Sequence, residues 1–449
     1  MSRSAADPRR VLFVSGFRIF PTQTGAHLRT GGIARVLARL GYQVLIYSLG
    51  GRRSDYHLPW RTPGRIVVEM EKNLTEEINL GLGFGLLQAV ARRLDYPRVW
   101  QYELLRRGFI PAGLRRALNE ADLIICDSSY CPVIPGPWSR KPWFMLSHNL
   151  ENRLLEHTAP RHRQFAPWMK RVEAAAPGTF QDIFPCADDD LQFFRSHDPS
   201  ARLRLPLIRC GVDPSVYAVP AETRTRVRAE LGLTDADRLL IFSGSRFEPN
   251  LDALRVLREF CHAEAEFLAR ERVHILVLGS VCDAASREGA LITTGRVPES
   301  IPYFAASDAG LNPMSLGSGA NVKLFEYLAA RLPILSTAFG VRGTELQPNI
   351  DYVAFEIPDL KSAIQTFISH SREEWQAHAE AVWTRHRSDC DIQILVANAI
   401  AQLPEFDLRG ITSASAPASS ASGSAAGGYE SASAPAIRTA GRSSTPETG

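Results

Sequence analysis

One stretch decides the fold and the candidate site, Ser315-Leu-Gly-Ser-Gly-Ala-Asn321-Val-Lys323-Leu-Phe-Glu326-Tyr-Leu-Ala-Ala-Arg331-Leu-Pro-Ile-Leu335. Its first half is small, polar and rich in glycine, which is typical of a loop. Its second half places Leu324, Phe325 and Leu328 at helical intervals until a proline interrupts the pattern. The stretch therefore predicts a loop that opens a helix.

The apolar run 308–313 before this loop is typical of the end of a buried strand. At the N-terminus of a helix, unpaired backbone N–H groups and the positive end of the helix dipole point toward any bound ligand. A phosphate group is therefore a favourable ligand at that position. Lys323 and Glu326 are three residues apart and lie on one side of the helix. Lys323 could supply a cation for a diphosphate, and Glu326 a carboxylate for sugar hydroxyls. Together they would form a binding site for a nucleotide sugar. The alternative is a surface ion pair on an ordinary helix.

Length and charge set broad limits on the class of protein. With 449 residues and 45% hydrophobic content, the chain can build two cores of roughly 150 to 200 residues each. The net charge is only +3, so bulk electrostatics gives no reason to expect a nucleic-acid partner.

The cysteines and the apolar runs indicate the cellular compartment in which the protein is expected. Seven cysteines lie without a repeated close pair, which argues against a zinc site or a disulfide framework and favours a reducing environment. The run Val11–Val14 is too short for a signal peptide, and no stretch reaches the roughly 18 apolar residues of a membrane span. We therefore expect a cytoplasmic protein.

The N-terminal half alternates strands and helices. Apolar runs at 11–14 and 43–47 predict strands around a helix at 28–40, which is the unit of a doubly wound parallel sheet. The loop before that helix contains Gly25, where the backbone could approach a ligand closely. The patterns G-x-G-x-x-G and G-x-x-x-x-G-K-[ST] are absent, so neither a nicotinamide cofactor nor a P-loop is supported.

Polar residues follow the next predicted strands, 123–127 and 142–147. His148 comes directly after the second of these, at a carboxyl end where open α/β sheets bind ligands. It could hydrogen-bond a ligand or act as an acid or base, or it could simply be a satisfied loop residue. The acidic run 188–190 could bind a metal, but capping of a following helix is the preferred interpretation.

The segment 80–87, Leu-Gly-Leu-Gly-Phe-Gly-Leu-Leu, precedes several pairs of arginines. An apolar segment beside basic pairs could rest on an anionic membrane surface, in which case the protein would be peripheral at the inner face of the plasma membrane. The preferred alternative is a loop and helix that pack on their own domain.

The alternation of strands and helices restarts at Arg238, after a Gly- and Pro-containing joint at 207–214. We therefore expect residues 1–205 to form an N-terminal Rossmann-like domain, with a C-terminal helix at 390–405 packing back on it. A second Rossmann-like domain would span 206–389 and bind the donor. Residues 408–449 are rich in Ser, Ala and Gly and are expected to be disordered.

Between about residues 10 and 405 the chain resembles the retaining glycosyltransferases of family 4, in the branch with a Gly-Ser-Gly loop. These enzymes have the GT-B fold, in which two facing Rossmann-like domains hold a nucleotide sugar in the cleft. The landmarks that carry the resemblance are Pro21 to Gly25, His148-Asn-Leu-Glu151, Ile208-Arg-Cys-Gly-Val-Asp213, Gly244-Ser-Arg-Phe-Glu-Pro-Asn250, Gly295-Arg-Val and Gly317-Ser-Gly-Ala-Asn-Val-Lys-Leu-Phe-Glu326.

The resemblance implies a role for each matching residue. Lys323 would hold donor phosphate, Glu326 the nucleotide ribose, and His148 would approach the transferred sugar. Arg246 and Lys323 would stabilise the departing nucleoside diphosphate, and no protein nucleophile is implied. The residues expected to bind the donor are Gly25, Gly244, Ser245, Asn250, Ser318, Gly319, Ala320, Asn321 and Glu326.

The chain departs from the family pattern at two places. The family has paired glutamates eight residues apart, but Ser318 stands where the first is expected. The family often has an arginine directly after the glycine equivalent to Gly244 and a lysine a few residues on, whereas this chain has Ser245 and Pro249 there, with Arg246 beside them. Contacts to the sugar and the role of Arg246 depend on these positions.

The expected function is therefore that of a retaining hexosyltransferase-like enzyme without metal or cofactor. It would use a UDP- or GDP-linked sugar and a glycan or lipid-linked glycan acceptor, as in polysaccharide biosynthesis. Two alternatives remain open: a nucleotide-sugar epimerase of the GT-B type, and a non-catalytic nucleotide- or sugar-binding partner of an active transferase.

Overall fold

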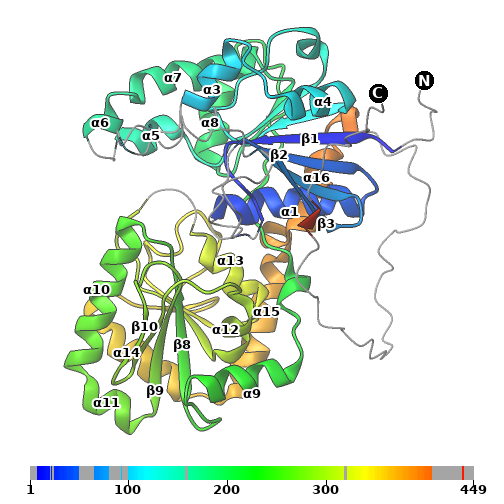
Figure 1. The fold of residues 1–449 in the computed structure, drawn as a ribbon. Coiled ribbons are helices and arrows are strands. Elements are labelled where there is room, and N and C mark those ends of the chain that lie inside the picture. Colours follow the sequence, from blue (N-terminus) through cyan, green and yellow to red (C-terminus); the bar gives the residue numbers. More distant parts are fainter. Residues whose placement is uncertain are drawn as a thin grey trace, which may run out of the picture. The chain divides into compact units, whose positions relative to one another are not determined.

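The structure is a computed structural model that describes residues 8–20, 22, 25–49, 65–79, 90, 93, 100–156, 160–317, 321–406 and 437–438. The chain forms two compact units, of which unit 1 comprises residues 1–208 and 396–449, and unit 2 comprises residues 209–395. Each unit is built around its own sheet (Figure 1).

The sheet of unit 1 is mostly parallel and has the described strand order β15-β3-β4-β2-β1-β5-β6-β7. The parallel strands are β1 (Arg10–Ser15), β2 (Gln43–Ser48), β4 (Leu74–Asn79), β5 (Leu123–Cys126), β6 (Trp143–Leu146) and β7 (Asp182–Phe184). The edge strands β3 (Arg65–Glu71) and β15 (Ile437–Arg438) run antiparallel to their neighbours. The strand order reverses direction at β1, as in doubly wound sheets.

Helices cover both faces of this sheet. On one face, α4 (Ala112–Glu120) packs its buried Leu114 and Leu118 into a core that includes Leu12 and Ile124 from the sheet. Helix α1 (Gly25–Arg39) connects β1 to β2 and buries Ile33, Val36 and Leu37. The remaining helices of unit 1 are α3 (Trp100–Arg106), α5 (Glu151–Glu156), α6 (Pro160–Arg163), α7 (Ala166–Ala175) and α8 (Asp188–Ser196).

The chain returns to unit 1 at its C-terminal end. Helix α16 (Ile392–Ile400) spans the boundary at residue 396, and the short helix Pro404–Phe406 follows it. The Phe406 ring lies 5.2 Å from the Phe144 ring centroid, and its carbonyl accepts a 3.0 Å hydrogen bond from the Tyr42 hydroxyl. The segment after residue 396 is thus part of the unit 1 core.

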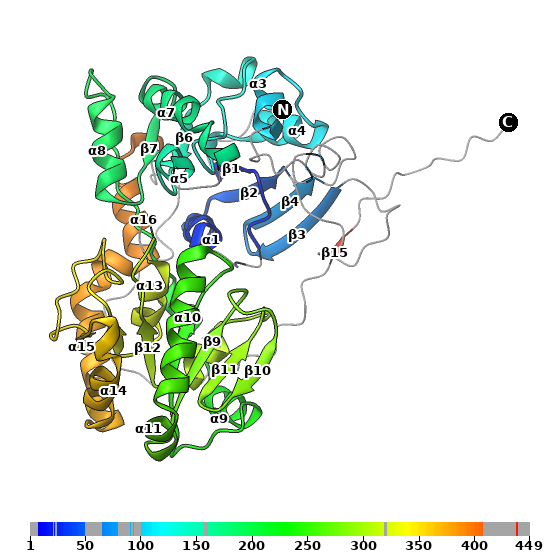
Figure 2. The same cartoon turned by 90° about the vertical axis from the view of Figure 1, so that its left-hand side faces the viewer.

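The sheet of unit 2 has the order β10-β11-β9-β8-β12-β13-β14. Its parallel strands are β8 (Arg238–Ser243), β9 (Val273–Leu278), β11 (Leu291–Thr294), β12 (Ala309–Asn312), β13 (Ile334–Ser336) and β14 (Val353–Ala354). The edge strand β10 (Ala285–Glu288) pairs antiparallel with β11, and Figure 2 shows β9, β11 and β10 side by side.

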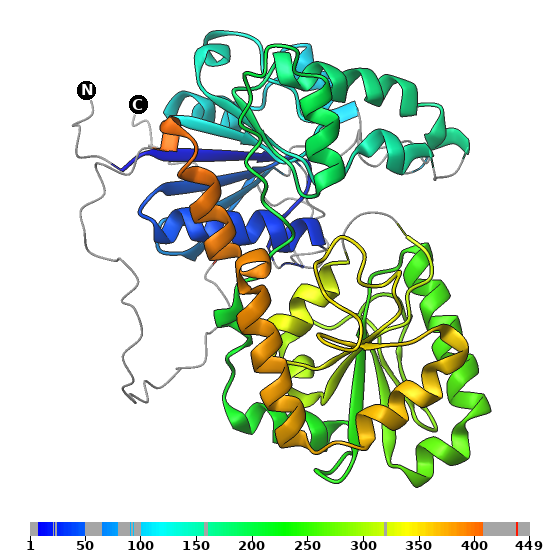
Figure 3. The same ribbon diagram turned by 180° about the vertical axis from the view of Figure 1, so that it is seen from behind.

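Two groups of helices cover this second sheet. One face is covered by α10 (Glu248–Ala263), α11 (Ala265–Arg270) and α14 (Leu360–Ile368), whose apolar residues share a core with β8 and β9. The other group contains α9 (Ala221–Glu230), which packs on α12 (Ile301–Ala306), and α13 (Val322–Ala329), which packs beside the long helix α15 (Arg372–Cys390) in Figure 3.

A buried carboxylate joins three of these segments. Asp308, just before β12, forms ion pairs with Arg224 at 2.6 Å, Arg228 at 3.2 Å and Arg372 at 3.1 Å. The Arg228 side chain is itself buried, so the charges of this cluster are compensated inside the unit.

The predicted fold class, two Rossmann-like α/β domains, is confirmed. Strand β10 and helix α14 were not predicted from the sequence, and neither was the antiparallel direction of the edge strands. The segment 80–87, for which packing on its own domain was preferred over membrane contact, lies outside the described residues. So does the predicted disordered tail, apart from the two residues of β15.

Candidate functional site

Helix α13 is fixed to the sheet of unit 2 by Tyr327. The single Tyr327 O–H lies within hydrogen-bond distance of two carbonyl oxygens, that of Ile241 in β8 at 3.0 Å and that of Leu311 in β12 at 3.1 Å. A Cβ at Gly310 would lie 2.4 Å from the tyrosine ring, so only glycine lets the helix approach this closely. The start of α13 is therefore held at the carboxyl edge of the sheet, beside the loops that follow β8 and β12.

Lys323 extends from the first turn of α13 into this edge. Its Nζ lies 3.0 Å from Asn250 Oδ1, 3.5 Å from Met314 Sδ and 4.4 Å from the centroid of the Phe242 ring. The side chain is buried, and burial lowers its pKa to about 7; Glu326 opposes this shift and the positive charge of Arg342 adds to it. A buried amine held by neutral groups is a ready partner for an anion.

Asn250 links Lys323 to the loop after β8. Its Nδ2 donates to the carbonyl of Ser245 at 2.9 Å while its Oδ1 accepts from Lys323. A Cβ on Gly244 would come within 3.0 Å of Asn250 Cγ, which explains the glycine at that position. Four predicted site residues, Gly244, Ser245, Asn250 and Lys323, are thus brought together.

Asn321 precedes α13 and stabilises its own loop. Its Nδ2 donates to Asn312 Oδ1 at 2.9 Å and to the Gly340 carbonyl at 3.2 Å. These bonds tie the loop after β12 to the loop after β13. The predicted donor-binding residues Ser318, Gly319 and Ala320 lie outside the described residues.

Glu326 lies one turn beyond Lys323 and accepts a 3.1 Å hydrogen bond from the Tyr217 hydroxyl. Burial raises the pKa of Glu326 to about 7, against the opposing effects of Tyr217 and Lys323. The predicted contact of Glu326 with a ribose stays a prediction, and Tyr217 is a partner that the sequence analysis did not identify.

Arg246 is separate from the buried cluster around Lys323. Its side chain is 66% exposed and pairs with the exposed Asp283, and its backbone N–H donates to Ser280 Oγ at 3.2 Å. A role in stabilising a leaving group would require the Arg246 side chain to leave Asp283. The predicted catalytic role of Arg246 stays a prediction.

In unit 1, His148 follows β6 and its Nε2 lies 2.7 Å from Asp127 Oδ1. Asp127, which follows the neighbouring strand β5, is fully buried and also accepts from Thr30 Oγ1 at 2.5 Å and Ser15 Oγ at 2.7 Å. The predicted residue Gly25 is the first residue of α1, the helix that carries Thr30.

The other ring nitrogen of His148 faces Arg29, with Nδ1 lying 3.5 Å from Arg29 Nη1. Arg29 is fully buried, and its guanidinium donates to the carbonyls of Ser147, Phe184, Pro185 and Ile208. Because a guanidinium can only donate, Nδ1 is the acceptor and Nε2 carries the proton toward Asp127. The ring of His148 is thus held on both sides by buried partners, and its predicted catalytic role toward a transferred sugar stays a prediction.

Three residues of this network were missed at the sequence level: Arg29, Asp127 and Glu173. Glu173 is buried in α7 and accepts from the backbone N–H groups of Glu151 and Asn152, which open α5 directly after the His148 turn. Of these three residues, only Asp127 could have been predicted from the sequence, because it follows a predicted strand just as His148 does.

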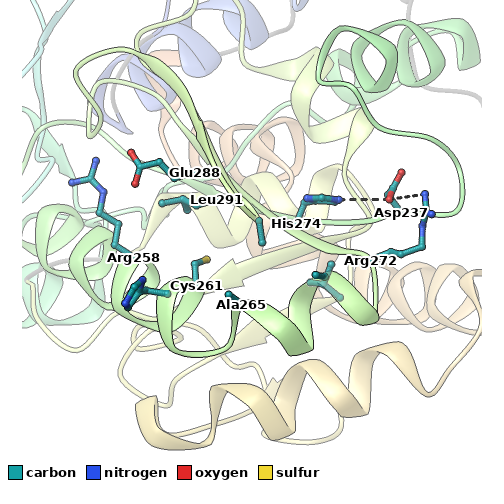
Figure 4. A pocket seen from close by; sticks show the side chains of 13 residues that line it. Asp237, Arg258, Cys261, Ala265, Arg272, His274, Glu288 and Leu291 are labelled. Atoms are coloured by element: carbon teal, nitrogen blue, oxygen red, sulfur yellow. Dashed lines mark ion pairs between the residues drawn. The ribbon is translucent and has the colours of Figure 1, made fainter.

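The described part of unit 2 also contains a pocket of about 760 Å³, shown in Figure 4. Asp237, Val273 and Leu291 line it near the amino ends of β8, β9 and β11, and Asp237 pairs with Arg272 at 2.9 Å and His274 at 3.5 Å. This is the opposite edge from the one that carries Lys323. Open α/β sheets bind ligands at the carboxyl ends of their strands, so the pocket is not the donor site.

Within the described residues, no group of three or more His, Cys, Asp or Glu side chains is placed to hold a metal ion. All seven cysteines are buried. Among the helices that the structure describes, none is both long enough and apolar enough to cross a membrane.

The fold and the site together define a two-unit, Rossmann-like α/β protein of the GT-B type. Residues 237–369, most of unit 2, match the family described as "Glycosyl transferases group 1". The family resemblance inferred from the sequence is confirmed for this region. A comparison with curated proteins finds no match.

Three solved structures illustrate the similarity in fold. HepE from Anabaena in complex with UDP and glucose is 15% identical, with 88% of this chain and 99% of that chain covered and a TM-score of 0.57. A UDP-forming trehalose-phosphate synthase from Burkholderia xenovorans in complex with glucose-6-phosphate is 16% identical, with 88% and 99% covered and a TM-score of 0.59. WaaG, a glycosyltransferase involved in lipopolysaccharide biosynthesis, is 15% identical, with 88% and 99% covered and a TM-score of 0.54.

Proposed function

We propose that the protein transfers a sugar from a nucleotide-sugar donor to a glycan or lipid-linked glycan, with retention of anomeric configuration and without a metal ion. The observation that carries the proposal is the buried Lys323 at the head of α13, held by Asn250 at the carboxyl edge of the sheet. It lies in the region that matches the group 1 glycosyltransferases.

The chemistry needs positive charge where the leaving group departs. Breaking the bond between the anomeric carbon and phosphate develops negative charge on the nucleoside diphosphate. The buried Lys323 amine and the N–H groups at the start of α13 would stabilise this charge in a site that excludes water. In this proposal the acceptor hydroxyl attacks from the face that the diphosphate leaves, so retention requires no protein nucleophile.

UDP is the first donor nucleotide to test, because the HepE structure contains UDP and the Burkholderia synthase is described as UDP-forming. WaaG acts in lipopolysaccharide biosynthesis, which supports a glycan or lipid-linked glycan as acceptor. We also propose a cytoplasmic location, with peripheral membrane contact tested by sedimentation with anionic liposomes at low salt.

The decisive experiment measures thermal stabilisation of the full chain by UDP, GDP and ADP and by their sugars, with Lys323→Ala in parallel. A ligand at a hundred times its dissociation constant stabilises a protein by about 2.7 kcal/mol. Stabilisation by one nucleotide family that is lost in Lys323→Ala would support the assignment and identify the base. A lack of stabilisation by all of them would contradict a nucleotide-sugar donor.

Turnover assays then separate the reaction types. Transfer to an acceptor, or slow hydrolysis of the donor, excludes a non-catalytic partner. Conversion of the donor sugar without an added acceptor would indicate an epimerase instead. A Lys323→Ala enzyme that turns over within a few-fold of the wild type would rule out the proposed role of Lys323.

A further inference from the structure

A second cation lies beside the candidate donor site, on the loop that follows β13. The Arg342 guanidinium carbon lies 4.1 Å from the centroid of the Phe339 ring, and Nη1 donates to the Phe339 carbonyl at 3.0 Å. Phe339 itself is exposed. The aromatic ring and the carbonyl fix the plane of the guanidinium, so the charge has a defined position.

Gly317 makes room for this guanidinium. A Cβ at position 317 would lie only 2.9 Å from Arg342 Nη2, and the next nearest atoms belong to Pro249, 3.6 Å away. Gly317 also has a φ of +134°, which side chains rarely adopt. The loop after β12, the start of α10 and Arg342 therefore meet at one point.

The loop that carries Arg342 is tied to the one that precedes Lys323. Thr337 donates through Oγ1 to the carbonyl of Met314, whose sulfur contacts Lys323. Asn321 donates to the Gly340 carbonyl at 3.2 Å. These hydrogen bonds fix the position of the Arg342 loop relative to the first turn of α13, which carries Lys323.

The two cations act on each other electrostatically. The positive charge of Arg342 contributes to lowering the pKa of Lys323, after the larger effect of burial. Two like charges that act on each other favour an anion that can neutralise both, and a diphosphate carries enough charge to do so. A planar guanidinium can also donate two parallel hydrogen bonds to a pair of phosphate oxygens, whereas a lysine ammonium acts as a point charge.

We propose that Arg342 is a second phosphate-binding residue of the donor site, which holds the diphosphate together with Lys323, and that Gly317 is required to accommodate its guanidinium. This inference rests on the proposed function, because it assigns a further residue to the same nucleotide-sugar site. It also assigns the loop after β13 to donor recognition.

The test compares wild type, Arg342→Ala and Arg342→Gln by isothermal titration of the full chain. The ligands are UDP, GDP and ADP together with uridine, guanosine and adenosine. Losing a hydrogen bond to a charged group typically weakens binding by about tenfold to a hundredfold. We expect that loss for the diphosphate that the wild type binds, and unchanged affinity for its nucleoside.

Two further variants sharpen the test. Arg331→Ala is the matched control, because Arg331 also lies over an aromatic ring of unit 2, 4.0 Å from the Trp383 centroid, just beyond the C-terminal end of α13. It should leave diphosphate affinity unchanged. Gly317→Ala should weaken diphosphate binding as Arg342→Ala does, because the added methyl displaces the guanidinium.

The outcomes distinguish this inference from the proposed function. Diphosphate affinity within twofold of the wild type in Arg342→Gln would overturn the role of Arg342 and leave the donor site intact. An equal loss of diphosphate and nucleoside binding would also overturn it, since the contact would then not be to phosphate. Failure of the wild type to bind any of the three diphosphates would instead refute the proposed function.

Discussion

Lys323 Nζ lies 3.0 Å from Asn250 Oδ1, and this hydrogen bond joins the first turn of α13 to the first turn of α10. A lysine is normally exposed, and here its charge is buried among an amide oxygen, a thioether and an aromatic ring. Burying the charge costs folding stability that a bound anion would offset. The consequences can be measured in both the free and the bound protein.

Replacing Lys323 with methionine should separate function from stability. Donor turnover should fall about a hundredfold or more, because removing one preorganised charged group typically costs about 2.7 to 4 kcal/mol of transition-state stabilisation. The melting temperature should not fall, since an apolar side chain of similar shape suits the buried site. A variant that melts well below the wild type at pH 7 would contradict this account.

The difference in stability between Lys323→Met and the wild type should depend on pH. Folding lowers the pKa of Lys323 from 10.5 to about 7, so its cost to stability is full below pH 7 and disappears as the pH rises to 10.5. The melting temperature of Lys323→Met relative to the wild type should therefore be highest near pH 7 and decrease toward pH 10. A difference that is constant over this range would show that Lys323 titrates normally.

Donor binding should take up a proton. Above pH 7 the free protein holds a neutral Lys323, whereas an anionic diphosphate favours the charged amine and raises its pKa. Titration calorimetry at pH 8, in two buffers with different ionisation enthalpies, should show uptake of close to one proton per nucleotide sugar. Residual binding by Lys323→Met should show none, and equal uptake in both proteins would assign the proton to another group.

Asp127→Asn should destabilise unit 1. Its carboxylate accepts hydrogen bonds from Ser15 and Thr30 and holds the His148 ring, so the amide leaves buried donors without their acceptor. Because asparagine keeps only one side-chain oxygen, at least one of these buried donors loses its acceptor, and we expect a loss of about 1 to 3 kcal/mol in the free energy of unfolding, measured by urea denaturation. The control is Asp189→Asn, whose carboxylate is 84% exposed and should change stability little.

Asp308→Asn should destabilise unit 2. Three arginines lose their common counter-ion, and removing one partner of a buried ion pair typically costs about 3 to 5 kcal/mol. Urea denaturation should show this loss, while Asp235→Asn, at an exposed partner of Arg228, should behave as the wild type does. Equal midpoints for the two variants would mean that the Asp308 cluster contributes little.

The fold could be predicted from the sequence because its strands are buried on both faces and appear as continuous apolar runs. Val11–Val14 and Arg238–Phe242 are examples, and both form central strands of their sheets. The edge strand β10, with the residues Ala285 to Glu288 all exposed, has no such pattern. Its position follows from pairing with β11, which is a tertiary interaction.

The candidate site was only partly predictable, for the same reason. Lys323 was identified because it opens a helix that follows a Gly-rich loop, whereas Gly244 and Asn250 were expected only from the family resemblance. Arg29 and Arg342 were not. Arg29 owes its position to backbone carbonyls far away in the sequence. Arg342 owes its position to the nearby Phe339 ring and to the space left by the distant Gly317. Single-sequence patterns do not record such contacts.

The attachment of Tyr327 to β8 and β12 limits where this site can evolve or be engineered. A helix that is hydrogen-bonded to the sheet cannot shift to accommodate a larger donor, so the position of Lys323 relative to the strands is fixed. The loops at this edge carry exposed side chains at Phe247 and Leu316, neither of which supports the core of unit 2. Changes of donor preference should therefore be sought at these two positions, where a side chain can be replaced without disturbing the core.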